Sequence, residues 1–124
     1  MASILIIDDD EGMCWALEKS LQSGGYRILT ATSGREGLAL FTDNLDDVKL
    51  ILLDVSLNDM NGLDILKQVM QKSASIPVLI MTGYSSMSVA LEAINRGAAG
   101  YLTKPFDMAG LREKVSVLLT ENQV

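Results

Sequence analysis

The sequence contains no histidine at all and a single cysteine, Cys14. Without histidine, neither a Ser-His-Asp nor a Cys-His catalytic arrangement can form, and an ordinary zinc site or a phosphohistidine carrier is excluded as well. A lone cysteine cannot form an internal disulfide, which agrees with a reducing compartment. The chemistry that remains open is that of carboxylates, lysines and hydroxyl groups.

Clustered basic residues and long apolar runs are also missing. The net charge of the 124 residues is −6, so we do not expect this domain itself to bind a nucleic-acid backbone, which requires grouped Lys and Arg. The apolar runs are far shorter than a transmembrane helix or a signal peptide, and we therefore expect a cytoplasmic protein with no membrane partner. Hydrophobic residues make up 48% of the chain and charged residues 21%, as in a single globular domain.

Short apolar runs alternate with segments of helical periodicity along the chain. The runs are rich in Ile, Leu and Val and predict buried strands at residues 4–7, 28–31, 50–53, 78–81 and 98–102. After each run, apolar residues recur every three or four positions, which predicts a helix. Five repeats of strand and helix indicate an α/β fold, a three-layer sandwich with a doubly wound parallel sheet between helices.

Cap residues support several of the predicted helix boundaries. Ser33 and Glu36 have the spacing of a capping box, and Asp107 is a candidate cap of the last helix. Gly24, Gly25 and Gly97 stand where helices should stop. These positions agree with the order of strands and helices.

Polar residues that can handle phosphate follow four of the five predicted strands. In chain order they are Asp8, Asp9 and Asp10 after the first strand, Asp54 after the third, Thr82 after the fourth and Lys104 after the fifth. Ligands bind parallel sheets of this kind beyond the carboxyl ends of the strands, where the strand order reverses. We therefore expect acid, hydroxyl and amine groups to meet at one edge of the sheet.

This set of residues predicts reversible phosphorylation of a carboxylate. Crowded carboxylates repel one another and are stable at neutral pH mainly when a hard cation such as Mg²⁺ lies among them. Asp54 is the candidate nucleophile, which would form an aspartyl phosphate. Asp9, with Asp8 behind it, would hold Mg²⁺, while Lys104 and Thr82 would meet the phosphoryl oxygens.

Five short motifs stand at the ends of the predicted strands or just after them. They are Ile6-Ile7-Asp8-Asp9-Asp10-Glu11, Leu52-Leu53-Asp54, Met60-Asn61-Gly62, Met81-Thr82-Gly83 and Tyr101-Leu102-Thr103-Lys104-Pro105-Phe106. In this order the motifs make the whole of residues 1–124 resemble a response-regulator receiver domain, the phosphoacceptor half of two-component signalling. The resemblance implies a flavodoxin-like (βα)5 fold with strand order 2-1-3-4-5. It also implies a switch with only weak self-catalysed phosphorylation and dephosphorylation, not a metabolic enzyme.

The resemblance further implies a role for each residue of the site. Asp54 would accept the phosphoryl group from a sensor histidine kinase. Asp9, Asp54 and the backbone carbonyl of Ser56 would bind Mg²⁺ directly, and Asp8 would act through water. Lys104, Thr82 and Asp54 would together form the reacting centre.

A conformational switch and its output are implied in the same way. Thr82 and Tyr101 would be the switch pair, which reshapes the surface made by the fourth helix, the fifth strand and the fifth helix. The resemblance also implies a homodimer that forms on phosphorylation. It further implies an output domain, attached or separate, that binds DNA. Trp15 and the run Lys104-Pro105-Phe106-Asp107 resemble receivers of sigma-54-dependent activators, and the Lys104-Pro105 bond is expected to be cis.

Other functions remain open on the sequence alone. Asp8 and Asp10 also fit the Asp-x-Asp motif of haloacid-dehalogenase-type phosphatases, although Gly12 replaces the usual Thr or Val and Asp54 would then have no task. An FMN-binding flavodoxin has the same architecture, but acids stand where its phosphate loop should be. An unphosphorylated pseudo-receiver would serve only as a docking module. Two residues depart from the receiver pattern, because Asn58 stands where a proline commonly restrains the loop and Gly83 replaces the commoner alanine.

Overall fold

The five strands form one parallel sheet in the order β2-β1-β3-β4-β5. A computed structural model describes residues 2–121, with the backbone alone described at Tyr84 and Glu121. The strands are β1 (Ser3–Ile7), β2 (Arg27–Ala31), β3 (Val48–Asp54), β4 (Val78–Thr82) and β5 (Gly100–Thr103). The predicted α/β class, the parallel sheet and the strand order are confirmed.

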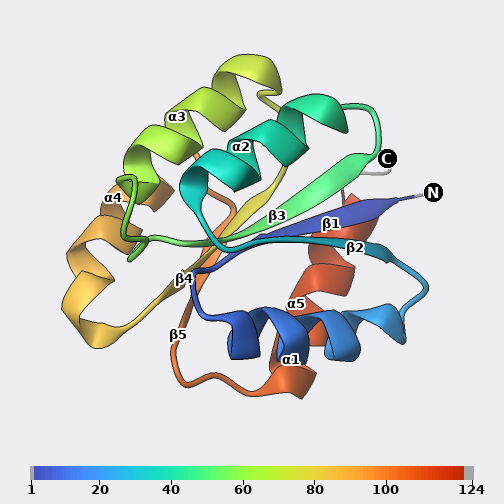
Figure 1. The fold of residues 1–124 in the computed structure, drawn as a ribbon. Coiled ribbons are helices and arrows are strands. Elements are labelled where there is room, and N and C mark those ends of the chain that lie inside the picture. Colours follow the sequence, from blue (N-terminus) through green and yellow to red (C-terminus); the bar gives the residue numbers. More distant parts are fainter. Residues whose placement is uncertain (1, 122–124) are drawn as a thin grey trace.

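Helices cover both faces of this sheet (Figure 1). They are α1 (Glu11–Gln22), α2 (Gly34–Asp43), α3 (Gly62–Lys72), α4 (Met87–Asn95) and α5 (Met108–Glu121), and a 3-10 turn, η1 (Tyr84–Ser86), leads into α4. Helices α1 and α5 pack on one face, and α2, α3 and α4 pack on the other. The molecule is thus the predicted three-layer sandwich. Within residues 2–121, no helix combines the length and the apolar character needed to cross a bilayer.

Alternate residues of β1 enter the two hydrophobic cores. Leu5 and Ile7 pack with residues of α2, α3 and α4, while Ile4 and Ile6 pack with residues of α1 and α5. None of these four side chains has exposed surface. Because successive side chains of a strand point to opposite faces, a strand covered on both faces is apolar at nearly every position. This requirement explains the unbroken apolar runs of the sequence.

Side-chain caps begin four of the helices described, α1, α2, α3 and α5. The first three capping side chains accept backbone N–H groups at 2.8–3.2 Å and belong to Asp10, Ser33 and Asn61. Asp107 also caps α5, as predicted, by accepting two backbone N–H bonds of 3.2 Å. The capping box is only half confirmed, because the Glu36 carboxylate accepts the N–H of Thr32 at 2.8 Å instead of that of Ser33.

The fifth strand begins two residues later than predicted, at Gly100. Gly97 has a φ of +110°, and the N–H of Ala98 bonds back to the carbonyl of Ala93 at 3.0 Å. These residues close the end of α4, as a glycine in the left-handed region commonly does, so they do not extend the strand. Gly25, with a φ of +84°, follows α1 in the same conformation.

Candidate functional site

The carboxyl ends of four strands bring the predicted site residues to one edge of the sheet. Asp8 directly follows β1, Asp54 ends β3, Thr82 ends β4 and Lys104 directly follows β5. The strands β1, β3, β4 and β5 are neighbours in that order, so these residues stand side by side. The strand order reverses at β1, which has β2 on one side and β3 on the other. The site therefore lies where parallel α/β sheets ordinarily bind ligands.

Lys104 joins two of the carboxylates. Its Nζ donates to Oδ2 of Asp8 at 2.8 Å and to Oδ2 of Asp54 at 3.1 Å. The Asp8 side chain has no exposed surface and that of Asp54 has 6%, whereas 26% of the Lys104 side chain is exposed. Short bonds between an ammonium and carboxylates are strong, and they compensate charges whose burial would otherwise be costly. The Lys104-Pro105 bond is cis, as the sequence resemblance implied.

Burial and this ion pair both change proton binding at the site. Burial raises the pKa of Asp8 above its ordinary 3.8, and the charge of Asp54 adds to the rise, whereas hydrogen bonds from Lys104 and from the N–H of Asp10 oppose it. Burial by itself would lower the pKa of Lys104, but its hydrogen bonds to Asp8 and Asp54 outweigh burial and hold the pKa above 10.5. Lys104 is therefore fully charged at neutral pH.

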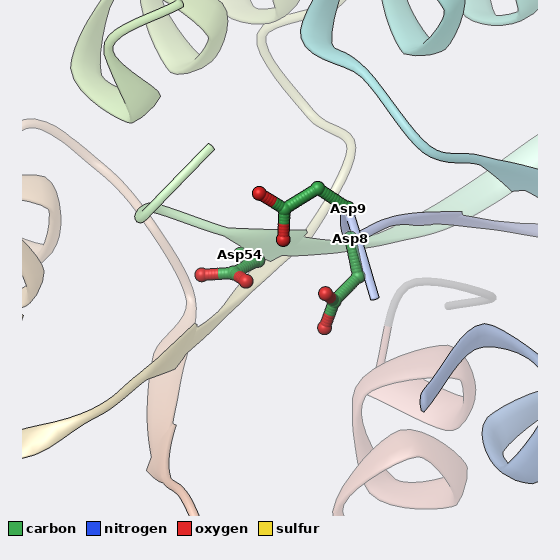
Figure 2. Close-up of side chains that lie close together, drawn as sticks. All are labelled: Asp8, Asp9 and Asp54. Atoms are coloured by element: carbon green, nitrogen blue, oxygen red, sulfur yellow. The ribbon is translucent and has the colours of Figure 1, made fainter. Parts of the chain in front are cut away.

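Asp8, Asp9 and Asp54 form one acidic cluster (Figure 2). One oxygen from each carboxylate lies within 4.8 Å of the oxygens of the other two. Figure 2 shows the Asp9 carboxylate reaching toward Asp54, while the Asp8 carboxylate points away from that of Asp9, downward in this view. The single ammonium of Lys104 cannot balance three carboxylates, and a divalent cation that prefers oxygen ligands would supply the missing positive charge. The residues thus fit Mg²⁺.

Two further predicted residues lie at or near this cluster. Oδ1 of Asp54 accepts the backbone N–H of Ser56 at 2.8 Å. The Thr82 side chain is buried, and its hydroxyl donates to the carbonyl of Gly83 at 2.9 Å. Tyr101, the other predicted switch residue, lies on β5 with 37% of its surface exposed. The structure therefore places Thr82 inside the site and Tyr101 at the molecular surface.

Asp10 does not join the acidic cluster. Its carboxylate accepts the N–H of Met13 at 3.2 Å and caps α1. The phosphatase interpretation requires Asp10 as an acid and base beside Asp8, and this capping bond gives Asp10 a different role. Lys104 also pairs with Asp8 and Asp54 together, which the phosphatase interpretation does not explain.

Asp59 restrains the loop after Asp54 in a way that the sequence did not reveal. Its carboxylate accepts the N–H of Gly34 at 2.8 Å and that of Arg35 at 3.1 Å, so it ties the loop to the start of α2. These hydrogen bonds lower the pKa of Asp59 below 3.8. They restrain the same loop in which Asn58 replaces a proline. An N-cap supplied from a distant segment has no sequence pattern, because the two segments are about 25 residues apart.

Known proteins resemble this chain over most of its length. The family model of the response regulator receiver domain matches residues 4–116. The chain is 38% identical over 121 residues to the transcriptional regulatory protein ZraR of Escherichia coli O157:H7, covering 98% of this chain and 27% of ZraR. It is 41% identical over 103 residues to the DNA-binding transcriptional regulator NtrC of Klebsiella pneumoniae, covering 83% of this chain and 22% of NtrC. The chain thus spans about a quarter of the length of the curated relatives it matches.

Solved structures show the same likeness over the whole fold. A response regulator receiver domain protein from Clostridium thermocellum has a TM-score of 0.94 and 29% identity, covering 99% of this chain and 98% of that chain. NtrX from Brucella abortus in complex with ADP has a TM-score of 0.90 and 27% identity, covering 99% of this chain and 28% of NtrX.

Proposed function

Because the chain belongs to the response regulator receiver domain family, we propose that Asp54 accepts a phosphoryl group from a sensor histidine kinase and thereby switches the surface of the domain. The chain is a signalling switch rather than a catalyst. One observation carries the assignment to Asp54: its carboxylate, only 6% exposed at the end of a central strand, is paired with Lys104 at 3.1 Å and lies in the acidic cluster.

The proposed transfer uses the carboxylate of Asp54 and the ammonium of Lys104. An oxygen of the Asp54 carboxylate forms a new bond to phosphorus, while the bond between phosphorus and the donor breaks. The donor is the phosphorylated imidazole of the kinase or a small acyl phosphate, and its nitrogen or oxygen leaves with the electron pair. The Lys104 ammonium would stabilise the negative charge on the transferred oxygens. The same groups would support slow self-catalysed phosphorylation and dephosphorylation.

Mg²⁺ is the proposed cofactor. Asp9, Asp54 and the backbone carbonyl of Ser56 would hold it directly, and Asp8 would do so through water. When bound, the ion would neutralise the repulsion between the carboxylates and an incoming phosphoryl group. The close spacing of the three carboxylates supports this assignment.

The proposed switch pair is Thr82 and Tyr101. The Thr82 hydroxyl, which now donates to Gly83, would turn to a phosphoryl oxygen, and the exposed Tyr101 ring would move inward. The output surface would be that of α4, β5 and α5. Each of these elements carries an exposed apolar residue, Leu91 at 50%, Tyr101 at 37% and Val117 at 49%. A phosphorylation-dependent homodimer would cover these side chains.

The relatives support a role in transcription for the whole protein. ZraR and NtrC are named as transcriptional regulators, and NtrC as DNA-binding. We therefore place residues 1–124, as one receiver domain, in a cytoplasmic system whose output domain, attached or separate, binds DNA. This assignment agrees with the sigma-54-dependent activator type that the sequence resembles. The net charge of −6 leaves nucleic-acid binding to that output domain.

Intact-mass measurement after incubation with acetyl phosphate and Mg²⁺ tests the proposal. The wild type should gain the mass of one phosphoryl group, and neither Asp54→Asn nor the wild type with EDTA should gain it. An adduct that persists in Asp54→Asn but disappears in Asp8→Asn would instead favour the phosphatase mechanism. An adduct that persists in both variants would exclude both assignments.

A further inference from the structure

The hydroxyl groups of Ser56 and Ser86 are hydrogen-bonded at 2.6 Å. This bond joins the loop after Asp54 to the start of α4. We propose that Ser86 is a two-position latch, whose hydroxyl binds Ser56 in the unphosphorylated protein and caps α4 in the phosphorylated protein. The inference rests on the proposed function, because it states how a phosphoryl group on Asp54 changes α4.

Ser86 occupies the N-cap position of α4 without acting as a cap. Its side chain makes no capping hydrogen bond, and its backbone has φ −113° and ψ 13°. Ser33, the N-cap of α2, has φ −145° and ψ 160°, and its hydroxyl accepts the N–H of Glu36. An extended backbone with a hydroxyl that accepts an N–H two or three residues later is the usual arrangement for a serine cap. The hydroxyl that should cap α4 is instead bound to Ser56.

One short route of hydrogen bonds leads to Ser86 from Asp54, and a second leads to it from Thr82. In the first, Asp54 accepts the N–H of Ser56 at 2.8 Å, and the Ser56 hydroxyl binds that of Ser86. In the second, the Thr82 hydroxyl donates to the carbonyl of Gly83 at 2.9 Å, and the same carbonyl accepts the N–H of Ser86 at 3.1 Å. A phosphoryl group on Asp54 would compete for the N–H of Ser56 and for the Thr82 hydroxyl. Both routes therefore change at the same event.

The second position of the latch follows from these bonds. When the Ser56 bond is lost, ψ of Ser86 is free to reach the extended range, and loosening of the turn held by the carbonyl of Gly83 adds to this freedom. Its hydroxyl can then accept the N–H of Val89, two residues after the first residue of α4. The Ser56 bond is exposed and competes with water, so its net strength is modest. The two positions of the Ser86 hydroxyl therefore differ little in free energy. A small difference in how the phosphoryl group interacts with each position can then shift the equilibrium between them.

Hydrogen exchange at the N–H groups of Ser88 and Val89 tests the latch. Mg²⁺ with beryllofluoride serves as the phosphoryl mimic. In the wild type, the mimic should slow exchange at these groups about fivefold, the effect of one serine cap. In Ser86→Ala, the mimic should produce no such slowing. In Ser56→Ala, exchange should already be slow without the mimic, because the Ser86 hydroxyl is released to cap α4.

The sign of the Ser56→Ala effect separates the latch from a simple tie between loops. A tie predicts faster exchange in α4 when the bond is removed, and the latch predicts slower exchange. Unchanged or faster exchange in Ser56→Ala would overturn the inference, as would slowing by the mimic that survives in Ser86→Ala. The matched control is Ser85→Ala, which removes an exposed hydroxyl from the same 3-10 turn and should behave as the wild type.

A parallel mass measurement keeps the two proposals distinguishable. Acetyl phosphate should phosphorylate the wild type. If Ser86→Ala is also phosphorylated but its exchange at Val89 does not become slower, that result supports the latch. An absent adduct on the wild type would overturn the proposed function. The Ser56→Ala comparison needs no phosphoryl group, so it decides in either case whether the Ser86 hydroxyl changes its partner.

Discussion

Replacing Lys104 with methionine should destabilise the protein in the absence of Mg²⁺. Methionine keeps an unbranched side chain but removes the ammonium that donates to Asp8 at 2.8 Å and to Asp54 at 3.1 Å. Deleting one partner of a fully buried ion pair costs about 3–5 kcal/mol, because a buried charge is left unpaired. The Lys104 side chain is 26% exposed, so water offsets part of this cost, and we expect a loss of about 2 kcal/mol in the free energy of unfolding.

The loss should vary with pH in a defined direction. Burial raises the pKa of Asp8, so its contribution to stability is greatest below 3.8 and declines as the pH rises through the raised pKa. The Lys104 hydrogen bond opposes that rise, so the variant should continue to lose stability to a higher pH than the wild type. At alkaline pH the wild type should lose the contribution of Lys104, which is fully present below 10.5 and disappears as the pH rises through its raised pKa. The variant has no such loss.

Mg²⁺ should recover part of the lost stability. The ion and the Lys104 ammonium would neutralise the same carboxylates, so removing one strengthens binding of the other. Recovery of about half of the ~2 kcal/mol loss corresponds to Mg²⁺ binding about fivefold more tightly to the variant than to the wild type.

Urea unfolding followed by circular dichroism, in EDTA and in saturating Mg²⁺, measures each of these quantities. If the free energy of unfolding falls with urea concentration at the same slope in all proteins, only stability has changed. Lys67→Met is the control, because Lys67 is an exposed lysine on α3. If Lys104→Met is as stable as the wild type in EDTA, or gains less from Mg²⁺, Lys104 does not neutralise the acidic cluster.

Three further changes test the surroundings of the site. A Cβ at Gly62 would lie 2.8 Å from Cα of Val55, so Gly62→Ala should cost about 1–3 kcal/mol in urea unfolding, whereas Gly83→Ala, with nothing within 4 Å, should stay within about 0.5 kcal/mol. Burial and the nearby charge of Asp8 raise the pKa of Cys14 to about 11, so iodoacetamide should label it more slowly in the native protein than in urea, and equal rates would contradict this. Asp59 contributes stability above pH 3.8 that is lost as the pH falls through its lowered pKa, so Asp59→Asn should lower stability at neutral pH and flatten the acid limb of a circular-dichroism titration. An unchanged acid limb would contradict that role.

The sheet and the charged centre of the site were predictable because both follow from patterns along the chain. An apolar run such as residues 4–7 is required by burial on both faces of a strand. Once such strands are known to be parallel, the residue after each one is assigned to the same edge of the sheet. This geometry brings Asp54 and Lys104 to 3.1 Å although about 50 residues separate them.

The contacts between loops were not predictable in this way. Asp59 caps α2 with two hydrogen bonds and Ser56 is joined to Ser86 by one, and in both cases the bonds join segments of no regular period. Each is worth about 1 kcal/mol, too little to impose a pattern on the surrounding sequence. The same reason explains why Glu36 was assigned to the wrong N–H group. The candidate signal at Ser86 was a serine directly before the helical periodicity that begins at Met87.

The packing of α4 shows why a change at Asp54 should act on this helix first. The fully buried side chains of α4 are Ala90 and Ala93, whereas α3 buries Ile65, Leu66 and Val69. Each buried methylene group contributes about 0.8 kcal/mol, so displacing α4 costs far less apolar burial than displacing α3. The Asn61 side chain also caps α3, while α4 begins without a side-chain cap. A phosphoryl contact at the sheet edge should therefore displace α4 more readily than its neighbour α3.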